Sequence, residues 1–493
     1  MSDPTNTSAP AHEAADLLQI RRDKLRVLQE HGAKPFGEKF EISHELSVLR
    51  ANFADGIPVR IAGRITARRD MGKSVFFDLS NVHGRMQCYL NGKEIDENTK
   101  EIFAKGLDIG DFVGVVGYTF HTRTGEPSVH LQELVVLSKS LRPLPEKWHG
   151  VTDRETKYRQ RYLDLISNED TRRTFLMRSQ ILSGIRRFLQ DRSYLEVETP
   201  MIQSIAGGAA ARPFSTHYNA LGQDMFLRIA PELYLKRLLV AGFDKVFELN
   251  RNFRNEGLSR RHNPEFTMLE IYQAFADFEQ MANLVEEMIC HLAETNCGTL
   301  QLDQKNAAGE VLRTVNLARP WRRTPYHELI KGAAGADWFE ITPEQRRARA
   351  KELHVEISPA MEDHEVTQQI FEKLVEEKTV DPLFVTHLPK ELVPLAKQNV
   401  ADPSLVDVYE LIINGQEISP GYSELNDPII QRERLENQAG EEVHKIDEEF
   451  LLAMEHGMPP AGGVGVGIDR LVILLTGVES IRDVILFPIL KDK

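Results

Sequence analysis

The sequence has few of the features that mark a secreted, membrane or repetitive protein. Its three cysteines, Cys88, Cys290 and Cys297, follow no disulfide or metal-ligand spacing, so we expect free thiols in a reducing cytoplasm. No run approaches the roughly 18 consecutive apolar residues that cross a bilayer, and the polar start MSDPTNTSAPAHEAAD is unlike a signal peptide. These absences predict a cytoplasmic protein without a membrane partner.

An excess of positive charge is also missing, because 60 Lys and Arg stand against 74 Asp and Glu, a formal net charge of −14. This balance excludes a protein that binds nucleic acid over its whole surface, but it leaves room for a local cluster of cations. The length of 493 residues predicts two or three domains.

The first 14 residues are expected to be disordered, and a helix with a basic side is expected over residues 17–28. The apolar face of that helix consists of Leu17, Ile20, Leu25 and Leu28. Its outer side carries Arg21, Arg22, Lys24 and Arg26. Two interpretations of these cations stay open, a solvated surface or a contact with nucleic acid.

Five short strands follow, with a helix at 93–107 between the third and the fourth; the strands are 58–70, 74–80, 84–90, 112–119 and 127–138. This order is typical of the OB-fold, a small barrel that often binds oligonucleotides. Single-strand binding needs aromatic rings and cations, which Phe76, Phe77, Arg68, Arg69 and Lys73 supply. Because Phe76 and Phe77 are adjacent, one must face the core and the other is free to stack on a base.

The remaining chain divides at a Pro-rich hinge, LRPLPEKWHG at 141–150, beyond which helices and strands alternate. We expect a charged helical insertion at about 335–400. The predicted divisions are a tail and basic helix at 1–56, an OB-fold at 57–145, a linker at 146–170 and a large domain at 171–493.

The stretch FRNEGLSRRHNPEF, residues 253–266, places many cations between two expected strands. Strand alternation over 246–256 puts Arg254 and Glu256 on one face, and 265–275 puts Phe266, Glu270 and Tyr272 on one face. An aromatic plane, a guanidinium and carboxylates on one surface suit a nucleotide. The alternative is a sheet surface of salt bridges.

Three motifs in order resemble those of class II aminoacyl-tRNA synthetases. Phe253-Arg254-x-Glu256 with His262-x-x-x-Phe266 resembles motif 2, and GGVGVGIDR at 462–470 resembles motif 3, which ends in Arg470. FLQDRSYLEVETPMI at 188–202 resembles motif 1, whose Pro200 implies a homodimer interface. The implied fold class is α+β and multidomain: an N-terminal OB-fold barrel and a catalytic domain with a mainly antiparallel sheet flanked by helices.

Within that class, synthetases with an N-terminal OB domain serve lysine, aspartate and asparagine, and KYRQRYLDL at 157–165 resembles their linker. A lysine pocket needs buried carboxylates, whereas an aspartate pocket needs cations. Glu232, Glu270 and Glu424 occupy the expected places, and the chain from about residue 58 resembles lysyl-tRNA synthetases of the bacterial class II type. The implied reaction joins lysine to its tRNA through a lysyl-adenylate, releasing AMP and pyrophosphate.

The resemblance implies a role for each matching residue. Arg254 would bridge the α-phosphate and the lysine carboxylate, and Arg470 would hold the γ-phosphate, as the two catalytic residues. The implied ATP contacts are Arg254, Glu256, His262, Asn263, Phe266, Gly467 and Arg470. The implied lysine contacts are Gly208, Glu232, Glu270, Tyr272, Tyr422 and Glu424. The implied anticodon contacts are Arg68, Phe76, Gln87 and Glu126.

A hairpin signal, Asn414-Gly415, suggests where a metal ion binds. The turn predicts that Ile412 lies opposite Glu417 and that Glu410 lies opposite Ser419. Glu410 and Glu417 are then diagonal neighbours that repel unless Mg²⁺ lies between them and the ATP phosphates. Two exposed strand glutamates are the alternative.

One departure from the family is Ser419-Pro420, where many members have a residue pair that ends in Asn. Proline offers no amide for a substrate, so that contact is either lost or moved to Ser419. Arg260 and Arg261 have no assigned role.

Three rival functions have less support. A protein-lysylating relative would lack the OB module, and a non-catalytic RNA-binding relative would have lost residues such as Arg254 or Arg470. An aspartate or asparagine enzyme would not carry the acidic pocket.

Overall fold

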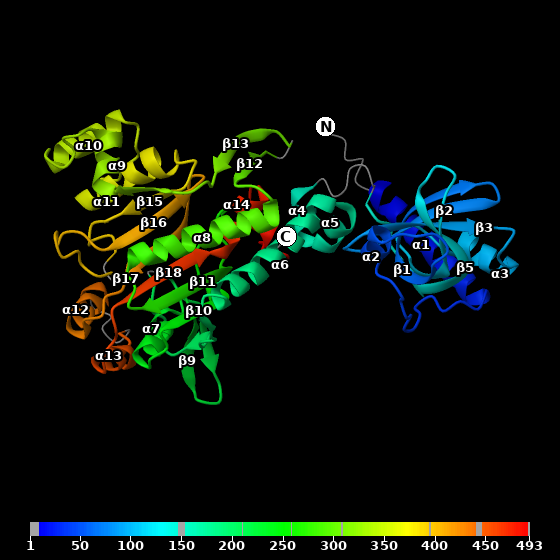
Figure 1. Cartoon of the computed structure of the whole chain (residues 1–493), viewed down its shortest axis with the longest axis horizontal. Helices are drawn as coiled ribbons and strands as arrows, with labels where there is room; N and C mark the ends of the chain where they lie inside the picture. Colours follow the sequence, from blue (N-terminus) through cyan, green and yellow to red (C-terminus); the bar gives the residue numbers. More distant parts are fainter. Residues whose placement is uncertain are drawn as a thin grey trace, which may run out of the picture. The chain divides into compact units, whose positions relative to one another are not determined.

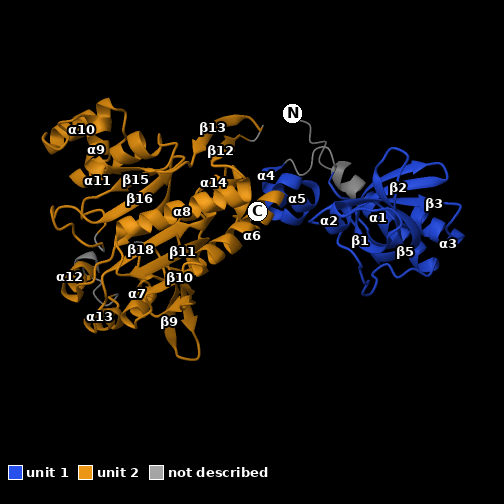
Figure 2. Cartoon of the chain, in the orientation of Figure 1, with its two compact units in different colours: residues 1–172 blue, residues 173–493 orange. Residues whose placement is uncertain are grey.

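The computed structural model describes residues 9–145, 153–209, 211–257, 259–306, 309–393, 396–439 and 446–491. Contacts divide the chain into two compact units, residues 1–172 and 173–493 (Figure 2). The predicted hinge at 141–150 lies partly outside the described residues. None of the described helices is both long enough and apolar enough to pass through a bilayer.

The first unit is built on a closed five-stranded barrel with the strand order β1-β2-β3-β5-β4 (Figure 1). Strands β3 and β5 are parallel, and the other described neighbours in the barrel are antiparallel. The predicted OB-fold is therefore confirmed. The strands are β1 (Pro58–Met71), β2 (Ser74–Ser80), β3 (Arg85–Asn91), β4 (Phe112–His121) and β5 (Pro127–Ser138).

Alternation along the strands separates the barrel core from its outer face. Phe77 is fully buried in that core, while its neighbour Phe76 is half-buried. The helix expected at 93–107 is shorter, because the Asp96 side chain accepts a hydrogen bond from the Thr99 amide and caps α3 (Glu97–Glu101). A π-helical turn, η1 (Ile102–Gly106), follows α3.

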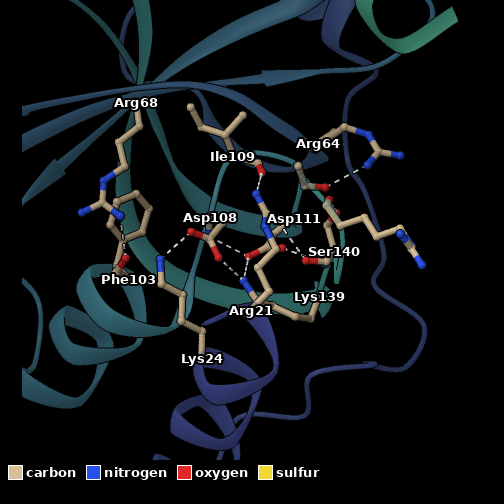
Figure 3. Close-up of polar contacts among 12 residues, drawn as sticks. Arg21, Lys24, Arg64, Arg68, Phe103, Asp108, Ile109, Asp111, Lys139 and Ser140 are labelled. Atoms are coloured by element: carbon tan, nitrogen blue, oxygen red, sulfur yellow. Dashed lines mark hydrogen bonds and ion pairs between the residues drawn. The ribbon is translucent and has the colours of Figure 1, made fainter. Parts of the chain in front are cut away.

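The N-terminal helix α1 (Ala9–Glu30) is longer than predicted, since residues 9–14 were expected to be disordered. The predicted faces of α1 are right only in part, since Leu28 is buried and Arg22 and Arg26 are exposed as predicted, while four other residues differ. Leu17 and Ile20 are 40% and 50% exposed, whereas Arg21 and Lys24 lie against the barrel (Figure 3). The Arg21 guanidinium donates to the carbonyls of Ser140 and Ile109 at 2.9 and 3.0 Å.

A buried ionic cluster explains why two cations face inward. The Lys139 ammonium, without exposed surface, lies 2.7 Å from an Asp108 oxygen and 2.8 Å from an Asp111 oxygen. Lys24 approaches the other oxygen of Asp108 at 2.5 Å (Figure 3). Burial disfavours the charged form of Asp108, but the bonds from Lys139 and Lys24 hold its pKa below the usual value.

The second unit contains an eight-stranded sheet with the order β14-β15-β16-β17-β18-β11-β10-β6 (Figure 1). The pairs β14/β15 and β10/β6 are parallel and the others antiparallel. The predicted mainly antiparallel sheet with flanking helices is confirmed. The strands are β14 (Arg322–Pro325), β15 (Leu383–Thr386), β16 (Val408–Ile413), β17 (Gln416–Ser423), β18 (Ala461–Gly467), β11 (Glu265–Ala274), β10 (Lys245–Phe253) and β6 (Leu195–Glu196).

One face of this sheet carries the main core. Phe247, Leu269 and Val464 point into it from the strands and pack with helices α6 (Glu169–Gln190), α8 (Phe278–Cys297) and α14 (Ile468–Thr476). Side chains alternate along a strand, so Glu270 and Gly465, next to Leu269 and Val464, belong to the opposite face. The apolar face thus leaves the other one free for a site.

The expected insertion at 335–400 contains the predicted helices but is interrupted by a strand of the main sheet, β15. Its helices are α10 (Pro343–Glu352), α11 (Asp363–Phe371) and the π-helical η2 (Glu372–Glu376), and α9 (Tyr326–Ala334) directly precedes it. They pack around Trp338 and Phe371 in a core of their own. A helix-rich insertion thus joins the main sheet through β15, the neighbour of the edge strand β14.

Shorter elements complete the two units. The first unit also has α2 (Leu46–Ala51), α4 (Arg154–Arg159) and α5 (Arg161–Ser167). In the second, β7 (Ile202–Gln203), β9 (Gln223–Leu227) and β8 (Ser215–Tyr218) form one small sheet, and β12 (Gln301–Lys305) and β13 (Val311–Asn316) another. Its remaining helices are α7 (Glu232–Val240), α12 (Pro428–Ala439), α13 (Glu448–Glu455) and α15 (Ile481–Val484).

The ionic cluster around Asp108 makes a testable prediction. Asp108→Asn should lower the free energy of unfolding of the first unit by about 1–2 kcal/mol, because two ammonium groups lose a charged partner. Thermal melting of the full chain measures this. The folded pKa of Asp108 is depressed, so the stabilisation exists above the ordinary Asp pKa and is lost as the pH falls through the folded value.

The control is Asp23→Asn, whose pair with Arg26 at 3.0 Å is exposed and should contribute close to nothing. Equal melting shifts for the two variants would contradict a stabilising role for the buried cluster.

Candidate active site and nucleic-acid face

The charged hairpin forms as an antiparallel pair, with Glu248 opposite Glu270, Asn250 opposite Met268 and Asn252 opposite Phe266. Directly opposed residues point to the same face of a sheet. Strand β10 ends at Phe253, so Arg254 and Glu256 lie beyond the strand, which was predicted to continue to 256. The Arg254 amide still donates to the Pro264 carbonyl at 2.9 Å and prolongs the pairing.

A cavity of about 440 Å³ opens over this face and collects most of the predicted site residues. All seven predicted ATP contacts line it: Arg254, Glu256, His262, Asn263, Phe266, Gly467 and Arg470. Five of the six predicted lysine contacts line it too: Gly208, Glu232, Glu270, Tyr272 and Tyr422. Glu417, from the predicted metal pair, is part of the same wall.

One end of the cavity is cationic and aromatic. The Arg254 guanidinium lies 5.2 Å from the centre of the Phe266 ring. Arg470, in the first turn of α14, donates to the Glu417 carbonyl at 2.6 Å and lies 3.4 Å from His262 Nε2. Burial and then the charge of Arg470 lower the pKa of His262, which keeps its imidazole neutral. This end suits an anionic ligand with an aromatic ring.

The two unassigned arginines of the loop have different positions. Arg261 lines the cavity. The Arg260 carbonyl accepts a hydrogen bond from the Ile481 amide at 2.9 Å, at the start of α15. Arg261 is therefore an additional cation at the anionic-ligand end, and the Arg260 backbone anchors the loop.

The other end of the cavity is acidic. Tyr272 donates its hydroxyl hydrogen bond to Glu270 at 3.1 Å, and burial followed by the charge of Glu232 raises the pKa of Glu270 to about 8. Burial also raises the pKa of Glu424 to about 7. This end of the cavity therefore disfavours further negative charge, and a cationic ligand would favour the ionised form of its carboxyl groups.

Glu424, the sixth predicted lysine contact, lies behind the cavity wall, next to the glycine-rich strand β18. A Cβ atom at Gly463 would lie 1.9 Å from a Glu424 oxygen and 2.6 Å from the Tyr272 ring. Gly463 is paired with both Tyr272 and Tyr422. The glycine is needed because the carboxylate and the tyrosine ring occupy the space of a side chain.

Sequence reasoning missed a residue at this end, Lys236. Its ammonium, fully buried, lies 2.6 Å from Glu232 and 2.5 Å from Glu424. The i,i+4 spacing of Glu232 and Lys236 in α7 was a visible signal for the first contact. The second contact joins α7 to the end of β17, and no local pattern reveals it.

The Asn414-Gly415 hairpin forms as predicted, with φ of 56° and 70° at these residues and Ile412 opposite Glu417. The predicted pairing of Glu410 with Ser419 is wrong, because Glu410 pairs with Pro420. A β-bulge adds one residue to β17 and shifts the register beyond Ile412.

Glu410 and Glu417 nevertheless interact. Burial, followed by the charge of Glu417, raises the pKa of Glu410 to about 8. Paired carboxylate oxygens suit a hard cation, so this donor set fits Mg²⁺. Across the described parts of the chain, no cluster of three or more His, Cys, Asp or Glu side chains is arranged to hold a metal.

The structure distinguishes the two residues of Ser419-Pro420. Pro420 lines the cavity, whereas Ser419 is fully buried. The Ser419 side chain is therefore not part of the cavity wall. The cavity has an apolar wall at Pro420.

On the barrel of the first unit, three of the four predicted anticodon contacts lie near one another. Phe76 and Gln87 share a face, because they pair with Tyr89 and Asp78 of the adjoining strands, and Glu126 precedes β5 beside Ser128, which accepts a bond from Gln87 at 2.8 Å. Aromatic contacts extend this face; its rings are Phe76, Tyr89, Tyr118, Phe120 and His130.

The structure separates Arg68 from this face. Arg68 is opposite the core residue Phe77, and its guanidinium lies 4.7 Å above the Phe103 ring (Figure 3). Arg69 is opposite Phe76 and donates to Gln87 at 2.8 Å. Strand alternation, read from Phe77 as the core residue, would have distinguished these arginines.

The sequence family described as tRNA synthetases class II (D, K and N) matches residues 153–491, which include the whole cavity wall. A second family, described as an OB-fold nucleic acid binding domain, matches residues 59–137. The chain therefore belongs to the class II tRNA synthetases of the D, K and N group.

Individual curated relatives are similar to this chain over nearly its whole length. A lysine–tRNA ligase of Carboxydothermus hydrogenoformans is 49% identical over 98% of this chain and 99% of its own length. Those of Pelotomaculum thermopropionicum and Bacillus subtilis are 48% and 46% identical, each over 98% of its own length. Similarity thus extends through both units.

Proposed function

We propose that this synthetase joins L-lysine to its cognate tRNA in an ATP-dependent reaction with a lysyl-adenylate intermediate. The observation that carries the proposal is the acidic end of the cavity, which Glu232 and Glu270 line and next to which Glu424 is buried, whereas the other end is cationic and aromatic. Lysine brings two ammonium groups, which suit such carboxylates, whereas aspartate would meet like charge. The names of the curated relatives agree with this choice.

The reaction follows from the arrangement of the two ends. Phe266 stacks on adenine with Arg470 on its other side, Glu256 accepts from the adenine amine, and His262, Asn263 and Gly467 complete the ATP contacts. Arg254 bridges the α-phosphate and the lysine carboxylate and so brings the nucleophile to the phosphorus atom.

The lysine carboxylate oxygen attacks the α-phosphorus, the bond to the bridging oxygen breaks, and pyrophosphate leaves with that electron pair. A ribose hydroxyl at the tRNA end then attacks the carbonyl carbon of the adenylate and releases AMP. Arg254 and Arg470 stabilise the negative charge that develops on the phosphates.

The lysine contacts divide by chemistry. Glu424 and Tyr272 receive the ε-ammonium, Gly208 and Glu232 the α-amino end, and Glu270 and Tyr422 complete the wall. The α-carboxylate remains directed to Arg254. Glu410 and Glu417 would hold Mg²⁺, which supplies positive charge to the phosphates when bound.

The first unit serves as the anticodon-binding domain, with Phe76, Gln87 and Glu126 as contacts and Arg69 in place of Arg68. The domain divisions predicted from the sequence are proposed with these roles: a tail and basic helix at 1–56, the anticodon-binding domain at 57–145, a linker at 146–170 and the catalytic domain at 171–493. Exposed Arg22 and Arg26 on α1 remain available to tRNA.

We also propose a homodimer through the motif 1 region around Pro200, because Leu195 and Ile202 on either side of that proline are both exposed. A cytoplasmic location is proposed from the free cysteines, Cys88, Cys290 and Cys297.

ATP–pyrophosphate exchange with each of the twenty amino acids tests the substrate. We expect exchange with lysine, and Glu424→Gln should raise the KM for lysine by roughly tenfold or more with little change for ATP, because a buried charged partner of the ε-ammonium is lost. Exchange stimulated by aspartate or asparagine instead would refute the substrate assignment. Equal KM changes for lysine and ATP would remove Glu424 from its role.

A pH profile tests the acidic pocket. Glu270 has a raised pKa of about 8, so it is protonated in the empty pocket at pH 7 and releases its proton when an ammonium group binds. The KM for lysine should therefore fall by up to about tenfold as the pH rises from 7 to 8. Glu270→Gln should keep only the dependence of Glu424, a fall of about twofold or less over that interval and a steeper one below pH 7. An unchanged slope in the variant would exclude Glu270 as the titrating group.

The two neighbouring arginines provide a matched pair for the anticodon face. Arg69→Ala should raise the KM for tRNA in aminoacylation by about fivefold or more, because it removes a cation from the stacking face. Arg68→Ala should change it less, and ATP–pyrophosphate exchange without tRNA should stay constant in both. A larger loss for Arg68→Ala would show that the reverse assignment holds.

A further inference from the structure

The pocket contains a cation of its own, although it is built to receive cations. Lys236 extends from α7 with no exposed surface, and its ammonium is not part of the cavity wall. It lies 2.6 Å from Oε1 of Glu232 and 2.5 Å from Oε2 of Glu424. Lys236 therefore connects Glu232, which is assigned to the α-amino end of lysine, with Glu424, which is assigned to its ε-ammonium.

Each of these carboxylates divides its oxygens between two directions. Glu232 turns Oε1 to Lys236, while Oε2 lies toward Gly208, 3.7 Å from where a Cβ on that glycine would be. Glu424 turns Oε2 to Lys236, while Oε1 lies against Gly463 and the Tyr272 ring. Neither oxygen of Glu424 makes a well-directed hydrogen bond within the described protein. Lys236 thus contacts one oxygen of each carboxylate, and the second oxygen of each points away from Lys236.

The number of charged groups in the pocket also supports a role for Lys236 in substrate binding. Glu232, Glu270 and Glu424 would place three negative charges in an enclosed volume, and Lys236 offsets one of them. The remaining two match the two ammonium groups of lysine. Burial lowers the pKa of Lys236, but the charges of Glu232 and Glu424 more than compensate and raise it, so the ammonium stays protonated.

We propose that Lys236 is a positioning residue for amino-acid selection, which holds Glu232 and Glu424 in register so that they bind the α-ammonium and the ε-ammonium of one substrate together. This inference rests on the proposed lysine specificity. Lys236 itself touches no substrate and acts through the two carboxylates. A buried ion pair of this kind gives little net stability, but removing one partner leaves charges uncompensated.

Lys236→Met tests the proposal, because methionine has a similar length and no charge. In ATP–pyrophosphate exchange the KM for lysine should rise at least about thirtyfold, as expected when a buried charge pair is broken, while the KM for ATP changes less than about threefold. The matched control is Lys139→Met, which removes another fully buried lysine held between two carboxylates, in the first unit. It should leave both KM values within about threefold of the parent chain.

A double-variant cycle separates positioning from a merely structural role. Lys236→Met and Glu424→Gln impair the same element, so the combined variant should have a KM for lysine at least about fivefold below the product of the two single effects. Combining Lys139→Met with Glu424→Gln should give the simple product. Multiplicative effects for the Lys236 pair, or equal changes in the KM for lysine and for ATP, would overturn the proposal.

Two further experiments cover the case in which Lys236→Met does not fold and the case in which lysine is not the substrate. If Lys236→Met does not melt as a folded protein, Lys236→Gln replaces it in the same cycle, with the same expected coupling. The parent chain tests the proposed function separately: exchange with an amino acid other than lysine refutes that function, whereas lysine exchange without coupling refutes only the role of Lys236.

Discussion

The structure around the site depends on the enclosure of like charges on one face of a sheet. Glu232, Glu270 and Glu424 come from α7, β11 and the residue after β17; Lys236 contacts two of them, and burial together with their mutual charge raises the pKa of Glu270 and Glu424. The single ammonium of Lys236 does not balance three carboxylates, so the pocket favours a ligand that carries positive charge. The same enclosure makes Gly463 necessary, since any side chain there would occupy the space of Glu424.

The sheet can hold such a pocket because its two faces have different tasks. Leu269 and Val464 anchor one face in the main core, and their neighbours Glu270 and Gly465 are thereby held on the other. Asp469 strengthens this arrangement by accepting from Arg178 at 2.7 Å and from the Thr267 amide at 2.8 Å. The helix that carries Arg470 is thus tied to the strand that carries Phe266 and Glu270, so the cationic end and the acidic end of the cavity share one support.

Prediction from sequence succeeded where the pattern was local. Strand alternation located the barrel, and Asn414-Gly415 located the hairpin, because a turn of two residues imposes its own geometry. It failed where a neighbour decided the outcome. The bulge in β17 moved Glu410 from Ser419 to Pro420, and Asp108 together with the Ser140 and Ile109 carbonyls holds Lys24 and Arg21 of α1 against the barrel. Arg68 and Arg69 could be distinguished only once Phe77 was known to face the core.

The sequence alone therefore determined the kinds of element, the order of the motifs and the chemical character of the cavity ends, because each is written in residues close along the chain. Only the tertiary structure decided which charged side chains form ion pairs with one another. The contact of Lys236 with Glu424 joins α7 to the end of β17. Gly463 of β18 lies against the same carboxylate, where a larger residue would collide with it. Contacts of this kind depend on distances between segments remote in sequence, which no periodicity encodes.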